Sequence, residues 1–98
     1  MQLLTNTPPR IIRLKAYHNF FSLVWNDRKT AELRSEDDIS YIRGDILYLC
    51  EIEEDSIFSD RVIIAQVVGV FRDVRFLQPG YVMLSIKVLA KYSNGVIQ

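Results

Sequence analysis

The sequence predicts an α+β fold: a small, curved and mainly antiparallel β-barrel of about five strands with one main helix packed on it. Three observations support this prediction. Runs rich in Val, Ile, Leu and Tyr recur along the chain, have the length of strands, and are separated by turn residues. One segment, residues 16–27, instead spaces its apolar residues by three and four positions, as a helix does. No internal repeat, low-complexity tract or linker divides the 98 residues, which are expected to form one domain with one modest core.

The first half of the chain predicts a strand, a helix and a second strand. Residues 1–9 end in a Pro-Pro pair and are expected to form an N-terminal arm, because proline cannot donate to a sheet ladder. The run RIIRLKA then reads as the first strand. The apolar side of the following helix places Trp25 and the pair Phe20-Phe21 in the predicted core. A second strand covers residues 30–34, and residues 35–43 are expected to form a connection that could hold one helical turn.

The second half predicts two consecutive strands in the centre of the sheet. Residues 46–52 are apolar at almost every position, which is typical of a strand covered on both sides. The acidic run EEDS that follows predicts a loop or hairpin end. Residues 61–71 are rich in Val and Ile and long enough to need a bend, for which Gly69 is the natural site.

The run Gln78-Pro79-Gly80 predicts a turn, after which residues 81–89 form the last strand. The domain therefore spans residues 10–90. Residues 91–98 are expected to form a frayed C-terminal tail.

Net charge is zero, but it is unevenly distributed along the chain. Residues 1–25 carry three bases and no acids, residues 26–60 four bases and eleven acids, and residues 61–98 five bases and one acid, which gives +3, −7 and +4. If the basic first strand and the basic last strands were neighbours, they would form a positive patch for phosphates. The alternative is that the charges only keep the surface soluble.

The cysteine and histidine content argues against disulfides and metal sites. Cys50 is the single cysteine, so no internal disulfide can form, and a cytoplasmic location is expected. His18 has no Cys, Asp or second His at ligand spacing, and we predict neither a metal nor a cofactor. The sequence has no signal-peptide pattern and no apolar segment long enough to span a membrane, so no membrane association is expected.

The most polar stretch, residues 29–45, predicts a binding site between apolar flanks. On the second strand, Glu32 and Arg34 would share one face while Ala31 and Leu33 point the other way. A carboxylate beside a guanidinium offers an acceptor and donors to a base edge. Alternatively, Glu32 and Arg34 form an ordinary ion pair on one face of a strand, which contributes little to stability. Lys29 immediately precedes this strand. It could make a cationic contact with a ligand, or it could be a turn lysine exposed to solvent.

Three further residues complete the predicted ligand-binding set. Lys15, together with Arg13, could contact phosphate, and Tyr81 could stack on a base, although core packing explains Tyr81 equally well. Asp45 after Gly44 could contact a ligand or fix a turn.

Four short motifs, in this order and spacing, resemble the ASCH superfamily, most closely the small DUF3850-type proteins of bacteria and their phages. They are Leu14-Lys15, RKTAELR at residues 28–34, RGDILYL at residues 43–49 and GYVMLSI at residues 80–86. The resemblance implies a PUA-like fold, a small β-barrel with flanking helices, and a cleft for RNA, nucleotides or modified nucleosides. In this family a His usually stands where this chain has Ile12.

The resemblance also implies a possible reaction. Some single-domain ASCH proteins are amidohydrolases that deacylate acetylated cytidine with a Lys, a Thr and a distal Glu. Lys29 matches the Lys, Glu32 stands at the Thr position, and no Glu follows residue 54. In a hydrolase, Lys29 would polarise the amide and Glu32 would activate water as a general base.

Three functions therefore remain open. The first is binding of RNA, a nucleotide or a modified nucleoside in the cleft around residues 29–34. The second is amide hydrolysis of a modified nucleoside by Lys29 and Glu32. The third is binding of a host protein, as a phage or mobile-element module, through the acidic segments 51–55 or 36–38.

Overall fold

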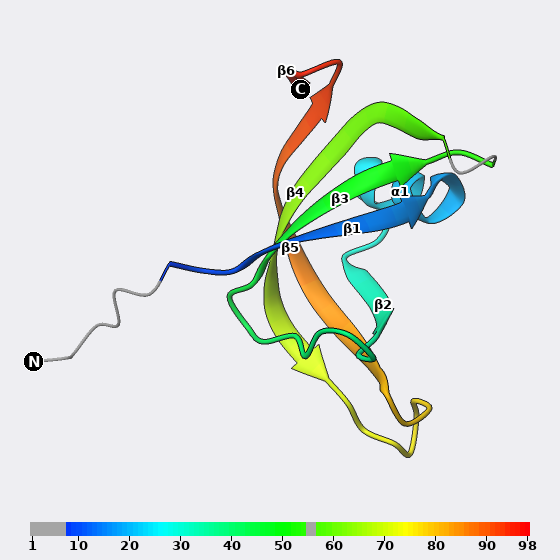
Figure 1. Ribbon diagram of the computed structural model, residues 1–98, viewed down its shortest axis with the longest axis vertical. Helices are drawn as coiled ribbons and strands as arrows, with labels where there is room; N and C mark the ends of the chain where they lie inside the picture. The colour runs from blue at the N-terminus through cyan, green and yellow to red at the C-terminus, as the bar shows by residue number, and fades with distance from the viewer. Residues whose placement is uncertain (1–7, 55–56) are drawn as a thin grey trace, which may run out of the picture.

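Strands β1, β3, β4, β5 and β2 lie in that order in one strongly curled sheet, with β6 added beside β5 (Figure 1). The computed structural model describes residues 8–54 and 57–98. Pairing is parallel between β1 and β3 and antiparallel elsewhere. The predicted α+β class is confirmed, as a mostly antiparallel half-barrel with a short helix. The elements in the described ranges are β1 Ile11–Tyr17, α1 His18–Trp25, β2 Ala31–Ser35, β3 Ile46–Ile52, β4 Phe58–Phe71, β5 Tyr81–Ser93 and β6 Val96–Ile97.

The helix carries the chain from one edge of the sheet to the other. β1 pairs with β3, whereas β2, which follows directly after α1, pairs with β5 at the opposite edge. The curl of the sheet brings these two edges towards each other, and the Arg34 side chain on β2 donates to the carbonyl oxygen of Lys15 on β1 at 3.1 Å. We call the gap between β1 and β2 the seam.

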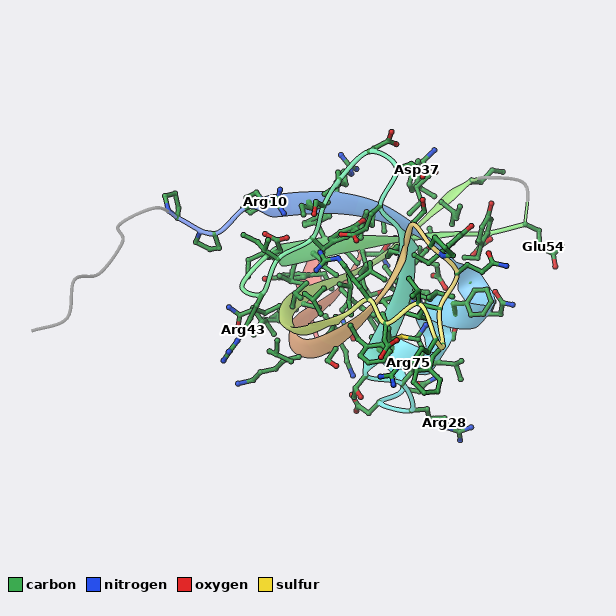
Figure 2. All side chains as sticks on the ribbon, turned by 90° about the horizontal axis from the view of Figure 1, so that it is seen from below. Arg10, Arg28, Asp37, Arg43, Glu54 and Arg75 are labelled. Carbon is green, nitrogen blue, oxygen red and sulfur yellow. The ribbon has the colours of Figure 1, made fainter. Side chains whose placement is uncertain are left out.

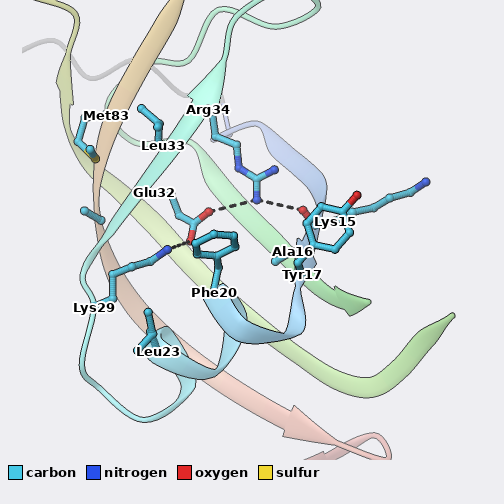
Figure 3. A pocket seen from close by; sticks show the side chains of 11 residues that line it. Lys15, Ala16, Tyr17, Phe20, Leu23, Lys29, Glu32, Leu33, Arg34 and Met83 are labelled. Carbon is cyan, nitrogen blue, oxygen red and sulfur yellow. Dashed lines mark hydrogen bonds and ion pairs between the residues drawn. The ribbon is translucent and has the colours of Figure 1, made fainter. Parts of the chain in front are cut away.

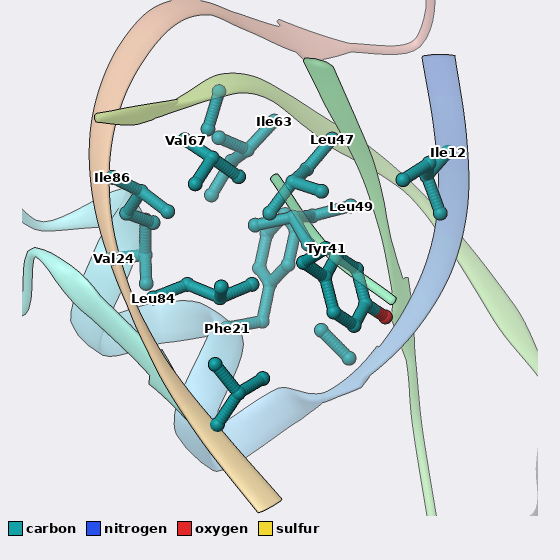
Figure 4. Packing of buried hydrophobic residues seen from close by; sticks show 13 residues of the cluster. Ile12, Phe21, Val24, Tyr41, Leu47, Leu49, Ile63, Val67, Leu84 and Ile86 are labelled. Atoms are coloured by element: carbon teal, nitrogen blue, oxygen red, sulfur yellow. The ribbon is translucent and has the colours of Figure 1, made fainter. Parts of the chain in front are cut away.

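The core fills the concave side of the sheet and is closed by the helix and one connection (Figure 4). From α1, Phe21 and Val24 face inward, while Phe20 is 53% exposed, so its predicted core position is wrong. A helix of two turns offers one narrow side to a sheet, and Phe20 lies just off that side. Trp25 is partly buried against the cluster. The core residues include Leu47 and Leu49 on β3, Ile63, Ala65 and Val67 on β4, Val82, Leu84 and Ile86 on β5, and Tyr41 from the connection.

The long strand β4 bends where the sequence predicted. The register with β5 shifts between Val67 and Gly69, as expected for a bulge at this glycine, and again between Ile64 and Ala65. The turn before β5 is also confirmed, because the Tyr81 amide donates to the Gln78 carbonyl at 3.1 Å and Gly80 has a φ of +85°. Residues 36–45 form the predicted connection, without a helical turn in this described segment.

The predicted frayed tail is wrong. β5 continues to Ser93 and turns back through Asn94 and Gly95, with φ values of 53° and 74°, into the short strand β6. The Asn-Gly dipeptide with both φ values positive is the usual signal of a tight hairpin. Two other predictions fall partly outside the described residues. These are the N-terminal arm, at residues 1–7, and the acidic loop, at residues 55–56. The remaining arm residues, Pro8 and Pro9, have no regular structure.

The sheet order does not meet the condition under which a positive patch was expected. β1 lies beside β3, and both β3 and β4 separate it from the basic strand β5. Exposed charges of both signs project around the molecule (Figure 2), among them Arg28, Asp37, Arg43, Glu54 and Arg75. Within the described residues, no helix has the length and apolar character needed to cross a membrane.

Candidate functional site

A pocket of about 520 Å³ opens at the seam, beside the N-terminal half of the domain (Figure 3). This volume lies in the range of small-molecule sites in proteins. Its walls combine an apolar majority with four charged side chains. It is lined by Lys15, Ala16, Tyr17, Phe20, Leu23, Lys29, Ala31, Glu32, Leu33, Arg34 and Met83.

Glu32 is the central polar group of this pocket. Its side chain is only 6% exposed, and each carboxylate oxygen faces a cation. Lys29 Nζ lies 3.1 Å from Oε1, and Arg34 Nη2 lies 3.1 Å from Oε2. A buried carboxylate is tolerated when cations lie this close, because desolvation would otherwise be too costly. The predicted association of Lys29, Glu32 and Arg34 is therefore present.

Strand alternation explains why these groups point into the seam. Glu32 lies opposite the fully buried Leu84 of β5 and shares its inward face, whereas Leu33 points outward and is 53% exposed. The alternation predicted for β2 is thus correct, but its polar side is the buried one. Because β2 is an edge strand, its inward polar side chains lie at the open border of the core and not in its centre.

Two buried atoms of this cluster have unfilled hydrogen-bonding capacity. Glu32 Oε1 is close to Lys29 Nζ but lacks hydrogen-bond geometry with it, and Arg34 Nε has no hydrogen-bond partner among the described residues. Buried polar atoms without a hydrogen bond are uncommon and costly. Two neighbouring pocket side chains therefore each hold a covered polar atom, an acceptor on Glu32 and a donor on Arg34, without a hydrogen bond among the described residues.

The mouth of the pocket is aromatic and basic. Lys29 Nζ lies 5.4 Å from the centre of the Phe20 ring, and Phe20 and Tyr17 are more than half exposed. Three cations and one carboxylate line the pocket, which leaves a net charge of +2. The site can accordingly accept a flat, partly apolar group together with negative charge.

Two predicted binding residues lie elsewhere. Asp45 is 1% exposed and accepts two hydrogen bonds from Arg10, at 2.9 and 2.6 Å, and one from the Ile42 amide at 2.9 Å. Burial raises the pKa of Asp45, but these hydrogen bonds outweigh it and the pKa is lowered. It therefore fixes the turn before β3. Tyr81 lies opposite Ser35 at the far end of β2 and does not line the pocket.

A second polar cluster was not predicted. Glu51, 2% exposed, accepts hydrogen bonds from Arg61 Nε at 2.9 Å, Arg61 Nη2 at 2.6 Å and Ser59 Oγ at 2.6 Å, and His18 Nδ1 lies 2.7 Å from Oε2. Arg61 also lies over the ring of Trp25, at 4.7 Å. This cluster ties α1 to β3 and β4. The signal that could have revealed it is the alternation of Leu47, Leu49 and Glu51, which places this acid on the inward face.

The acidic segments considered for a protein partner are only partly available. Glu51 is buried, and Glu36 is held by Arg72, whose Nε and Nη2 donate at 2.6 and 2.9 Å. Asp37, Asp38 and Glu53 remain exposed. Among the described residues, no group of three or more His, Cys, Asp or Glu could hold a metal ion.

The fold and the pocket together define a small α+β half-barrel domain with a ligand-sized pocket at its open seam. The sequence matches the family described as a domain of unknown function, DUF3850, over residues 11–86, which is most of the chain, and the chain belongs to this family. No curated protein matches the sequence.

Proposed function

We propose that the pocket at the seam binds a nucleobase, presented as a nucleoside, a nucleotide or an unpaired residue of RNA. The observation that supports this is the pair of buried, unfilled polar atoms, Glu32 Oε1 and Arg34 Nε. The edge of every nucleobase carries donors and acceptors next to each other. Both atoms are covered, so a base edge would have to displace the side chains over them before it donates to Glu32 and accepts from Arg34.

The surroundings of Glu32 suit the rest of such a ligand. Phe20 and Tyr17 are exposed aromatic side chains at the mouth, where a base can stack. Lys15 and Lys29 supply positive charge for a phosphate. We also infer that this domain has the PUA-like fold of the ASCH superfamily, because the motifs quoted above contain Lys15, Lys29, Glu32 and Arg34, all of which line the pocket.

The test is a titration of the purified protein with nucleosides, 5′-monophosphates and short single-stranded RNAs, acetylated cytidine included. A ligand of the native state should raise Tm by mass action. Glu32→Gln keeps the side-chain size but removes the charged acceptor, so it should weaken binding at least about tenfold, or about 1.4 kcal/mol. Calorimetry gives the affinity, and circular dichroism checks the fold.

Glu53→Gln is the matched control, because Glu53 is exposed and lies outside the pocket. It should bind like the unaltered protein. Equal losses in both variants would place binding elsewhere, and the absence of any Tm shift across the panel would reject nucleobase binding.

Amide hydrolysis is a second candidate, favoured by the 3.1 Å approach of Lys29 Nζ to Glu32 Oε1 inside the pocket. In this reaction Glu32 takes a proton from water, the hydroxide adds to the amide carbon, and Lys29 stabilises the oxyanion. The C–N bond then breaks, and the leaving amine takes the proton from Glu32.

Incubation with acetylated cytidine should release cytidine and acetate over many turnovers, as followed by chromatography. Lys29→Ala should lower the rate by about 100-fold or more, since it removes the oxyanion partner. If the compound binds but no acetate is released, the domain is a binding module and not a hydrolase.

A further inference from the structure

The outer face of β2, β5 and β4 carries an apolar ridge beside a trough of small residues. The strand register aligns Leu33, Met83 and Phe71 across the three strands, and we call this row the ridge. The next row along the strands consists of Ala31, Ser85 and Gly69, and we call it the trough. Leu33 is 53% exposed and Phe71 46%.

The ridge continues onto the loop between β4 and β5. Phe76 is 74% exposed, Val74 68% and Tyr81 41%, and the rings of Phe71 and Phe76 are 6.4 Å apart. Soluble proteins seldom expose so many large apolar side chains side by side unless the surface binds something.

Gly69 keeps the trough empty. Its φ lies outside the left-handed region, so the sign of its φ does not require a glycine. A Cβ at this position would lie 3.4 Å from both Cβ and Oγ of Ser85, and a longer side chain would extend into the trough. A bulky row and a hollow row therefore lie next to each other on one face.

We propose that this face binds a second copy of the same chain, with the ridge of each copy seated in the trough of the other. A two-fold axis that lies between the two faces, parallel to the rows, turns the faces towards each other and reverses the order of the rows. The ridge of the first copy then lies over the trough of the second, and the ridge of the second lies over the trough of the first. This arrangement buries both ridges with the close packing that stable interfaces need.

The two ends of the face agree with a second copy. Lys87, aligned with Gln66, lies beyond the trough, whereas Tyr81, 41% exposed, lies beyond the ridge. The same two-fold axis brings Lys87 of one copy to the Tyr81 ring of the other, where a cation is favourable. RNA fits this face less well, because Arg75 is already paired with Asp73 at 2.5 Å.

Leu33 and Met83 of the ridge and Ala31 of the trough also line the pocket at the seam, so a second copy would cover one lip of that pocket. The proposal rests on the shape and charge of the outer face and holds whether or not the pocket binds a nucleobase.

The test is sedimentation equilibrium of the full chain up to about 1 mM, together with three variants. Leu33→Asp places a charge on the ridge and should weaken the dimer at least about tenfold. Ile11→Asp is the control, because Ile11 is 74% exposed on β1, outside this face, and it should leave the dimer unchanged. Circular dichroism and Tm confirm that each variant is folded.

Ser85→Trp separates specific packing from general stickiness. It adds apolar surface but fills the trough, so ridge-in-trough packing predicts weaker association by at least about tenfold. Stronger association of Ser85→Trp would overturn the proposal, as would a chain that stays monomeric throughout the range. A monomer that binds single-stranded RNA, and loses it with Phe71→Asp, a ridge position outside the pocket, would assign the face to nucleic acid instead.

Discussion

Replacing Arg61 with alanine should lower the free energy of unfolding by about 3 kcal/mol, because it leaves a buried carboxylate without its main partner. Glu51 is 2% exposed and receives two of its hydrogen bonds from the Arg61 guanidinium, at 2.9 and 2.6 Å. The change also removes the contact of the guanidinium with the Trp25 ring, which helps to hold α1 against the sheet. Urea unfolding followed by circular dichroism measures the loss.

Arg75→Ala is the matched control, since it breaks an ion pair of the same type on the surface. The Arg75 side chain is 78% exposed, and exposed pairs contribute about 0–1 kcal/mol. Arg61→Ala/Glu51→Leu should recover part of the loss, because no buried charge then remains. Equal effects of Arg61→Ala and Arg75→Ala would show that burial of Glu51 contributes little.

Stability should fall by at least about 2 kcal/mol when the pH is lowered from 5 towards 2, through both Glu51 and Glu36. Burial raises the pKa of Glu51, but hydrogen bonds from Arg61, Ser59 and His18 outweigh it and lower the pKa from 4.5 to about 2. In Glu36, the hydrogen bond from Arg72 is the main cause of a pKa that is also about 2. A carboxylate with a lowered pKa stabilises the fold above its unfolded pKa, and this contribution is lost as pH falls towards the folded value.

Urea unfolding at a series of pH values between 7 and 2.5 tests this expectation. Glu51→Gln cannot ionise, so its stability should be lower at neutral pH and fall less steeply below pH 5. Asp73→Asn removes the carboxylate of a surface ion pair and should keep the steep fall. If Glu51→Gln keeps the full pH dependence, other groups are responsible for the acid sensitivity.

Local sequence patterns predicted most of the fold, and long-range pairing explains what they missed. Spacing located α1 and most strands, and Gly69 marked the bend in β4. The same patterns carry no information on which strands meet, so they could not decide whether β1 lies beside β5; the sheet order places β3 and β4 between these two strands. The hairpin at Asn94 and Gly95 was missed although its turn signal is local, because the short β6 lacks a strand pattern of its own.

The candidate site was predictable in its composition but not in its burial. Strand alternation correctly grouped Glu32 with Arg34 and separated them from Leu33. Which of the two faces turns inward depends on the curl of the whole sheet, which no local pattern specifies. Asp45 was chosen for its place beside Gly44, yet its partner Arg10 lies 35 residues away in the sequence, so their pairing could not be foreseen.

At the seam, β1 and β2 are not joined as neighbours in the backbone ladder of the sheet. Backbone ladders fix the spacing of neighbouring strands at about 4.8 Å, but β1 and β2 are linked across the seam by the Arg34 side chain, bonded to a single backbone carbonyl. Rotating that side chain would break its bonds to the Lys15 carbonyl and to Glu32, but no backbone ladder. Substitutions at positions 32 and 34 should therefore alter the pocket without breaking a ladder of the sheet.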